Sequence, residues 1–206
     1  MALTHVLVVR QSYNLASDAD FAAATAHWQE RHAATFADVH VHRGVQSAAV
    51  YVYFELAVPA EWSIADRRAF ETTLGTDGVL RNDGTTVTRL ECVLDVPGAS
   101  FGEQRMLHYV VETDAAAGSR DELLRWYDTE HMPGLARVPG CIRARRFINH
   151  DDGPFSYACY DLTRAGVTES PAWLAVRASP WSDRVRPQFR NTARTMFREL
   201  ALPADG

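Results

Sequence analysis

The hexapeptide Tyr51-Val-Tyr-Phe-Glu-Leu56 recurs 106 positions later as Tyr157-Ala-Cys-Tyr-Asp-Leu162, with apolar and polar residues in a similar order. The similarity extends to both sides of this segment, and at an offset of 99 it aligns His32 with His131. Self-similarity over most of a chain is typical of a tandem repeat. The sequence therefore predicts two copies of one structural unit.

We expect the copies to span residues 1–97 and 104–206. Each copy has the pattern of strand, helix, strand, strand, helix, strand, which is the order of a ferredoxin-like unit. One such unit leaves a sheet face uncovered, so two units are expected to pack sheet to sheet. The predicted fold class is α+β: two tandem ferredoxin-like units that form a dimeric α+β barrel within one chain.

The first helix of the second copy has recognisable expected ends. Ser119 and Glu122 have the spacing of a capping box, and Ser17–Asp20 offers a similar start in the first copy. The run Met132-Pro-Gly134 should end the helix just after His131, because proline and glycine disfavour helix interiors.

Composition removes several classes of chemistry. All 21 basic residues of this 206-residue chain are arginine, so Schiff-base, pyridoxal-phosphate and P-loop lysines are excluded. A formal net charge of −5 disfavours nucleic acid and anionic membranes as partners. No apolar run approaches the roughly 20 residues of a membrane span. The three widely spaced cysteines fit reduced thiols, and we expect a cytoplasmic protein.

The segment WYDTEHMPGLARVPGCIRARRF, from Trp126 to Phe147, resembles the EthD-like branch of the dimeric α+β barrel superfamily. The resemblance implies a barrel whose cavities lie between the sheet and the helices. It also implies activities found among such proteins: cofactor-free cyclases, isomerases and monooxygenases that act on small aromatic or polyketide-like molecules, together with some haem proteins. Because one fold supports many reactions, the resemblance does not select one of them.

His131 is the leading candidate catalytic residue. Leu123, Tyr127 and His131 recur at helical spacing, so Tyr127 and His131 should face the sheet. Asp128 lies three residues before His131 and could orient its imidazole. In this interpretation His131 moves a proton, Tyr127 stabilises negative charge, and the helix C-terminus favours the protonated imidazole. The alternative is a histidine that only caps the helix, beside aromatic core residues.

Four further residues are predicted to bind substrate: His108, Trp126, Arg146 and Tyr157. Strand alternation places His108 either towards the site helix or towards the opposite sheet, where it would be a buried structural histidine. Arg146 lies on the opposite strand face from Arg143 and Arg145, which we expect to be solvated. A guanidinium there could hold a carboxylate or phenolate. The remaining late arginines are expected to be surface charges: Arg184, Arg186, Arg190, Arg194 and Arg198.

The first copy contains a segment that aligns with the site helix. Trp28 and His32 align with Tyr127 and His131. Because tryptophan has no phenol, a second identical site is not expected, and the first copy is interpreted as structural.

Two other patterns receive structural interpretations. His40 and His42 share a face of an extended segment, but no third ligand has suitable spacing, so no metal site is predicted. Gly98-Ala-Ser-Phe-Gly102 matches the GxSxG pattern of a nucleophile elbow. A strand is expected after it instead of a helix, so it is interpreted as a connector.

The predicted function is that of a cofactor-independent enzyme of specialised metabolism or aromatic catabolism. It would cyclise, isomerise or eliminate a small aromatic or polyketide-like substrate by acid–base chemistry, with no cofactor and no metal. The expected partner is the small-molecule substrate, and the chain is expected to be a monomer or homodimer. The alternatives are a non-catalytic small-molecule-binding or accessory protein, a haem-binding protein, and a cofactor-free oxygenase of the same superfamily.

Overall fold

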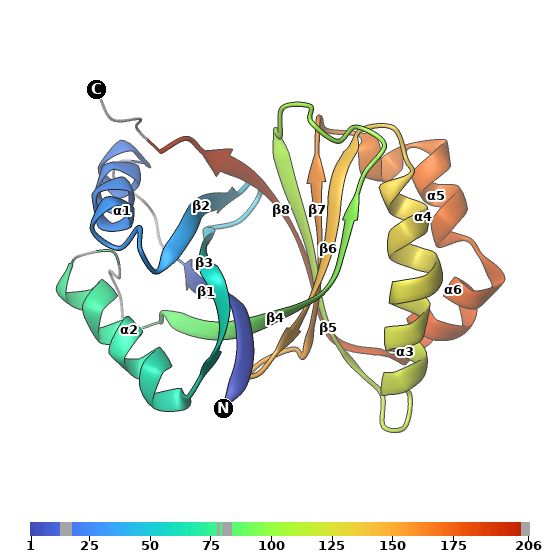
Figure 1. The fold of residues 1–206 in the computed structure, drawn as a ribbon. Helices are drawn as coiled ribbons and strands as arrows, with labels where there is room; N and C mark the ends of the chain where they lie inside the picture. The colour runs from blue at the N-terminus through green and yellow to red at the C-terminus, as the bar shows by residue number, and fades with distance from the viewer. Residues whose placement is uncertain (13–17, 78, 80–83, 203–206) are drawn as a thin grey trace. The chain divides into compact units, whose positions relative to one another are not determined.

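The computed structural model describes residues 1–12, 18–77, 79 and 84–202 (Figure 1). The first half contains β1 (Ala2–Ser12), α1 (Asp18–Arg31), β2 (Phe36–Gly44), β3 (Ala49–Trp62), α2 (Ile64–Thr76) and β4 (Thr86–Pro97). The second half contains β5 (Leu107–Ala115), α3 (Arg120–Trp126), the π-helix η1 (Tyr127–His131), α4 (Met132–Ala136), β6 (Cys141–Asn149), β7 (Ser156–Leu162), η2 (Val167–Glu169), α5 (Pro171–Arg177), α6 (Pro180–Val185), η3 (Arg186–Gln188) and β8 (Phe189–Leu200). The order of strands and helical segments in each half is the predicted one.

The chain divides into two compact units. Unit 1 consists of Met1–Glu91, Asn149–Asp152 and Arg198–Gly206, and unit 2 of Cys92–Ile148 and Gly153–Phe197. Strands β4 and β8 contribute residues to both units. Hydrogen bonds connect the eight strands in the order β1-β3-β2-β8-β5-β7-β6-β4, which closes into a barrel. The α+β barrel architecture is therefore confirmed, whereas the boundaries 1–97 and 104–206 stay a prediction.

Unit 1 has a solid aromatic core. Its strands are covered on one side by α1 and α2 (Figure 1). The indole of Trp28 on α1 contacts the rings of Phe36, Phe54 and Phe70, with centroid separations of 5.0 to 5.7 Å. Helix α2 begins at a capping box in which Ser63 and Asp66 exchange hydrogen bonds. These contacts leave the space beneath α1 filled by side chains.

Unit 2 has its helices on one face of its strands (Figure 1). Strands β5 and β7 are antiparallel, with Tyr109 opposite Tyr160 and Val111 opposite Ala158. Because successive strand residues alternate between faces, these four side chains share the face covered by α3, α4 and α5. The face that β5 and β7 turn away from the helices carries polar residues, among them His108 and Asp161.

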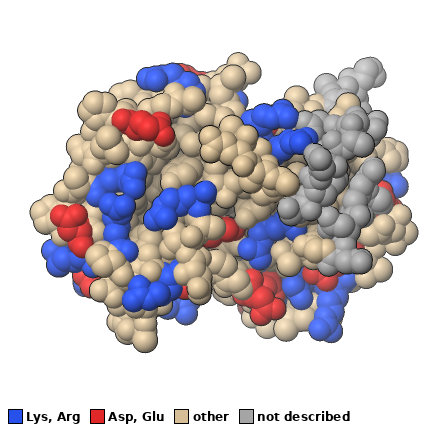
Figure 2. Space-filling view, turned by 180° about the vertical axis from the view of Figure 1, so that it is seen from behind, with Lys and Arg blue, Asp and Glu red and all other residues tan. Residues whose placement is uncertain are grey.

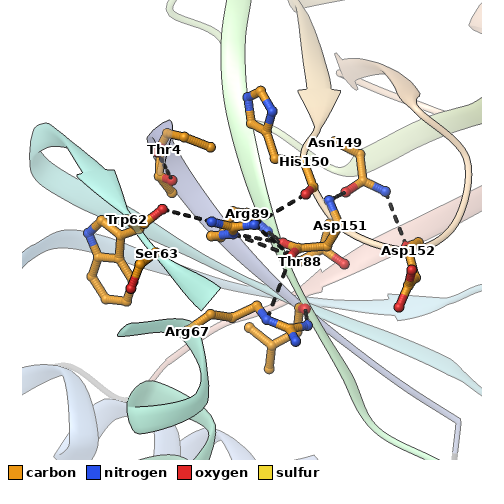
Figure 3. Close-up of polar contacts among 12 residues, drawn as sticks. Thr4, Trp62, Ser63, Arg67, Thr88, Arg89, Asn149, His150, Asp151 and Asp152 are labelled. Atoms are coloured by element: carbon orange, nitrogen blue, oxygen red, sulfur yellow. Dashed lines mark hydrogen bonds and ion pairs between the residues drawn. The ribbon is translucent and has the colours of Figure 1, made fainter. Parts of the chain in front are cut away.

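A buried arginine fastens three segments of unit 1 together (Figure 3). Arg89 on β4 donates from Nε and Nη2 to the Asp151 carboxylate, at 3.1 and 2.9 Å. Its Nη1 donates to the backbone oxygen of Trp62 at 2.7 Å, and Nη2 also reaches the backbone oxygen of His150. The side chains of Arg89 and Asp151 are only 6% and 7% exposed. This pair therefore ties the turn at Asn149–Asp152 to β4 and to the end of β3.

Three local expectations require correction or comment. The hydroxyl of Ser119 makes no capping bond and lies 3.4 Å from the Gln188 side-chain oxygen, so the predicted capping box at this helix is wrong. Ser17, the start of the cap expected in the first copy, lies outside the described residues. The segment Gly98–Gly102 is a connector, as predicted: Ser100 accepts a hydrogen bond from the backbone of Gly140, and β5 follows.

No helix in the described part of the chain is long and apolar enough to cross a membrane.

Candidate functional site

A narrow pocket lies between the sheet and the helices of unit 2, where the superfamily resemblance implies a cavity. It contains about 390 Å³ of space when its open mouth is included, and about 30 Å³ of this is wide enough to hold water. That interior has room for only a few water molecules. A ring-sized ligand therefore requires rotation of side chains at the mouth. The lining residues are Tyr109, Val111, Trp126, Tyr127, His131, Leu135, Tyr160, Trp173, Arg177, Arg186, Phe189 and Arg194.

A π turn shapes the wall of this pocket. The helix does not end after His131: it passes through η1 and continues as α4 to Ala136, contrary to prediction. The backbone N–H of Met132 donates to the oxygen of Tyr127, five residues earlier, and Pro133, which has no N–H to donate, follows at the start of α4. The wide turn accommodates proline without breaking the helix.

The π turn inserts one residue relative to the first half. In α1, Trp28 stacks on His32 four residues later, with centroids 4.2 Å apart. In η1, Trp126 stacks on His131 five residues later, at 4.0 Å. Trp28 therefore corresponds to Trp126, and the alignment of Trp28 with Tyr127 is wrong. Tyr127 is the extra residue, and the π turn turns its ring into the pocket.

His131 is a buried, neutral imidazole. Its residue is 8% exposed, and its Nδ1 makes no hydrogen bond to any described residue. Burial, reinforced by the charges of Arg177 and Arg186, lowers the pKa of His131 to about 3. The expected stabilisation of imidazolium by a helix C-terminus is absent because α4 continues beyond this residue. His131 therefore enters any reaction at neutral pH in its unprotonated form.

Asp128 does not orient His131. Its carboxylate accepts two hydrogen bonds from Arg146, from Nε at 2.7 Å and from Nη2 at 2.8 Å. The expected inward orientation of Arg146 is correct, since the residue is 3% exposed, but its side chain is bound to Asp128 and does not line the pocket. This pair fixes η1 against β6. Asp128 and Arg146 thus act on the position of the site helix.

His108 and Tyr157 lie on the opposite strand face from the pocket. In the β5–β7 register, His108 pairs with Asp161 and Glu112 pairs with Tyr157, on the face that Tyr109 and Tyr160 do not occupy. The imidazole Nδ1 of His108 lies 2.7 Å from the Asp161 carboxylate. His108 is therefore the buried structural histidine of the alternative interpretation, and neither residue joins His131.

Three phenols line the remaining wall: Tyr127 and Tyr160 are buried, and Tyr109 is half-buried. Tyr109 and Tyr160 face each other with centroids 6.2 Å apart, and Tyr127 lies 5.7 Å from the His131 ring. Burial raises the pKa of all three tyrosines above the ordinary value, so they remain protonated hydrogen-bond donors. The Tyr160 hydroxyl and the Trp126 indole N–H have no hydrogen-bond partner among the described residues. A polar ligand atom in the pocket would satisfy such groups.

Three arginines surround the mouth: Arg177 at the end of α5, Arg186 in η3 and Arg194 on β8. Arg186 and Arg194 are exposed, as predicted for surface charges, but they also line the pocket; Arg177, which is half-buried, was not singled out from the sequence. The sequence also predicted a solvated Arg145, although this residue is 6% exposed. On the face drawn in Figure 2, basic side chains lie in separate groups with acidic ones nearby. The described residues of this face therefore form no single large basic patch.

Unit 1 has different residues at the positions that correspond to the pocket walls of unit 2. The strand positions of Tyr109 and Tyr160 correspond in unit 1 to Leu7 and Phe54, which are opposite each other in the β1–β3 pair. Both are fully buried in the unit 1 core. The described part of unit 1 thus has no phenols at these two positions and no residue inserted between Trp28 and His32.

The described residues also bear on metal and haem binding. Within the described ranges, no group of three or more His, Cys, Asp or Glu side chains is arranged to hold a metal ion. The superfamily resemblance includes haem proteins, but a haem does not fit this pocket. The imidazole of His131 lies flat against Trp126, and the interior holds only a few waters. A macrocycle would have to separate α3 and α5 from the sheet.

No protein-family model matches the sequence, and no curated protein matches it. Solved structures match over nearly the whole chain. A mutant chlorite dismutase from Candidatus Nitrospira defluvii has a TM-score of 0.64 and 11% identity, and covers 98% of this chain and 94% of its own. An anthrone oxidase-like protein has a TM-score of 0.61 and 16% identity, with 96% and 92% covered. A heme-degrading enzyme from Listeria monocytogenes has a TM-score of 0.51 and 8% identity, with 93% and 98% covered. At these identities the matches show the fold alone, which is an α+β fold with a closed eight-stranded barrel.

Proposed function

We propose that the unit 2 pocket is the active site of a cofactor-independent enzyme that takes a proton from a small, enolisable aromatic substrate. The observation that carries the proposal is His131: a neutral, nine-tenths buried imidazole whose Nδ1 has no partner among the described residues, in an aromatic pocket that three arginines also line. Perturbed groups in a cleft are candidates for acid–base chemistry. The proton moves from a substrate carbon to the imidazole and returns to another atom, so isomerisation balances without a co-reactant.

The low pKa of His131 determines how the base must work. A weakly basic imidazole accepts a proton only if the anion left on the substrate is strongly stabilised. The guanidinium groups of Arg177 and Arg186 are close enough to influence His131 electrostatically, and they would equally stabilise an enolate. Tyr127 is a protonated donor beside the imidazole. Base and anion stabilisers therefore face the same small space.

The test is deuterium exchange. Phenylpyruvate, β-tetralone and anthrone are incubated with the protein in deuterium oxide, and incorporation at the enolisable carbon is followed by NMR. The wild type should accelerate exchange of at least one probe, and His131→Gln should reduce that acceleration about a hundredfold, which is the lower range for loss of a general base.

His27→Gln is the matched control, because His27 is an exposed histidine of α1 far outside the pocket lining. It should exchange the probes at the wild-type rate. Circular dichroism and thermal unfolding show whether His131→Gln is folded. The proposal fails if the wild type gives only the buffer rate with all three probes, or if folded His131→Gln retains full acceleration.

A second candidate is a cofactor-free oxygenase. The fold is similar to that of an anthrone oxidase-like protein, and an enolate held in an apolar pocket could deliver its electrons to dioxygen. Oxygen consumption equal to the substrate consumed supports this outcome, and exchange without oxygen uptake supports isomerisation. A binding protein without chemistry would retain a ligand in His131→Gln and show no exchange in the wild type.

The finer structural placement also remains a proposal. We propose that the chain is a tandem of ferredoxin-like units, 1–97 and 104–206, of the EthD-like branch. The supporting features are the repeated element order and the matching faces of 51–56 and 157–162.

A further inference from the structure

The mouth of the unit 2 pocket is formed by three guanidinium groups from three different segments. Arg177 comes from the last turn of α5, Arg186 from η3 and Arg194 from β8. Some other arginines of unit 2 have carboxylate partners, as in the pairs Arg146–Asp128 and Arg143–Asp95. Among the described residues, Arg184 and Arg190 bond only to backbone oxygens. The three mouth arginines have no carboxylate within ion-pair distance among the described residues.

The mouth arginines act on one another and on the pocket. Burial lowers the pKa of Arg186, and the charges of Arg177 and Arg194 lower it further, while Asp183 only partly opposes them. The positive charge of Arg194 also acts on the phenols of Tyr109 and Tyr127. Like charges held together without a counter-charge are unfavourable. An anion at the mouth would relieve this repulsion.

The walls define the rest of the ligand. Behind the arginines the pocket is bounded by aromatic rings, with Trp126, Tyr160 and Trp173 as the largest buried members. Planar guanidinium forks match the geometry of a carboxylate, and aromatic walls suit a flat ring. We propose that the ligand of this site is a small aromatic carboxylate, bound with its carboxylate at Arg177, Arg186 and Arg194 and its ring towards His131 and Trp126. This inference deepens the proposed function by naming a ligand class. It rests on the proposed function only because both concern the same pocket.

The experiment compares salicylate with salicylamide by isothermal titration calorimetry. The two probes share ring and hydroxyl and differ in charge. The wild type should bind salicylate about ten- to hundredfold more tightly, as expected for charge-assisted hydrogen bonds. Arg186→Gln should remove most of this preference, and Arg186→Gln with Arg194→Gln should remove all of it. Added salt should weaken salicylate binding more than salicylamide binding.

Arg184→Gln provides the matched control. Arg184 is an exposed arginine of α6, two positions from Arg186, and it does not line the pocket. The substitution removes the same charge and should leave the preference intact. Equal affinity for both probes in the wild type, no binding of either at millimolar concentration, or equal losses in Arg184→Gln and Arg186→Gln would each overturn the inference.

His131→Gln separates this inference from the proposed function. It keeps all three mouth arginines, so it should keep the preference for salicylate. If the wild type lacks the preference but exchange still depends on His131, only the ligand class is wrong. If the preference is present and exchange does not depend on His131, the proposed function is wrong and the ligand class stands.

Discussion

Asp151→Asn should lower the free energy of unfolding by about 3–5 kcal/mol, because it leaves the buried Arg89 guanidinium without a counter-charge. Arg89 uses Nε, Nη1 and Nη2 in this cluster, and its backbone N–H also donates to Asp151 at 2.7 Å (Figure 3). Arg67 contributes a second positive charge 3.7 Å from the same carboxylate. Urea unfolding at neutral pH measures the loss.

Asp95→Asn is the control for this prediction. Asp95 also pairs with an arginine, Arg143, but the two side chains are 39% and 37% exposed. An exposed pair of this kind contributes about 0–1 kcal/mol. If Asp151→Asn costs no more than Asp95→Asn, the Arg89 cluster does not stabilise the fold as argued.

The same pair has a pH signature. Burial alone would raise the pKa of Asp151, but the hydrogen bonds and charge of Arg89 outweigh it and hold the pKa below the ordinary value. The stabilisation is therefore fully present above about pH 4 and is lost as the pH falls through the lowered pKa. The fall in the free energy of unfolding below about pH 4 should therefore change in Asp151→Asn, which has no carboxylate at this position. It should be unchanged in Asp95→Asn.

The fold could be predicted because apolar residues alternate along the strands in both halves. The matched segments 51–56 and 157–162 keep their faces: Phe54 and Tyr160 point to the helices, whereas Tyr53 and Cys159 point away. Such periodicity is local and depends little on the rest of the chain. The strand faces of His108 and Tyr157 were harder to predict, because every residue of β7 is buried and burial therefore does not distinguish its two faces.

The site helix was only partly predictable. Helical spacing correctly placed Tyr127 and His131 in one pocket, because residues four positions apart lie close together in an α-helix and also in a π-helix. The π turn was not predictable from an α-helical template, although the alignment error between Trp28 and Tyr127 was its signal: a one-residue shift would have matched Trp28 with Trp126. Asp128 was misassigned because its true partner, Arg146, is distant in the sequence.

Arg177 was not singled out from the sequence, and Arg186 and Arg194 were predicted only as surface charges, for a related reason. Arg177, Arg186 and Arg194 come from three separate segments, and no sequence spacing links them. The charges of Arg177 and Arg186 oppose protonation of His131, so a carboxylate bound there would remove part of this opposition and make the imidazole a stronger base. If the proposed ligand binds, ligand recognition and base strength would be coupled through Arg177 and Arg186.

The last prediction concerns stability in acid. The pKa of His131 is about 3 in the folded protein and about 6.5 in an unfolded chain. Between these values the unfolded state binds more protons, so His131 destabilises the fold as the pH falls below 6.5. The loss should reach about 2–3 kcal/mol at pH 4.5 and about 5 kcal/mol across the whole window. It is measured by urea unfolding of wild type and His131→Gln at a series of pH values.

Loss of the Trp126 stack shifts the free energy of unfolding of His131→Gln at every pH. The slope of this free energy against pH is therefore compared, and His131→Gln should have the smaller slope. His27→Gln should retain the wild-type slope. Equal slopes for wild type and His131→Gln would mean that His131 is not held neutral by burial, and the base assignment would lose its physical ground.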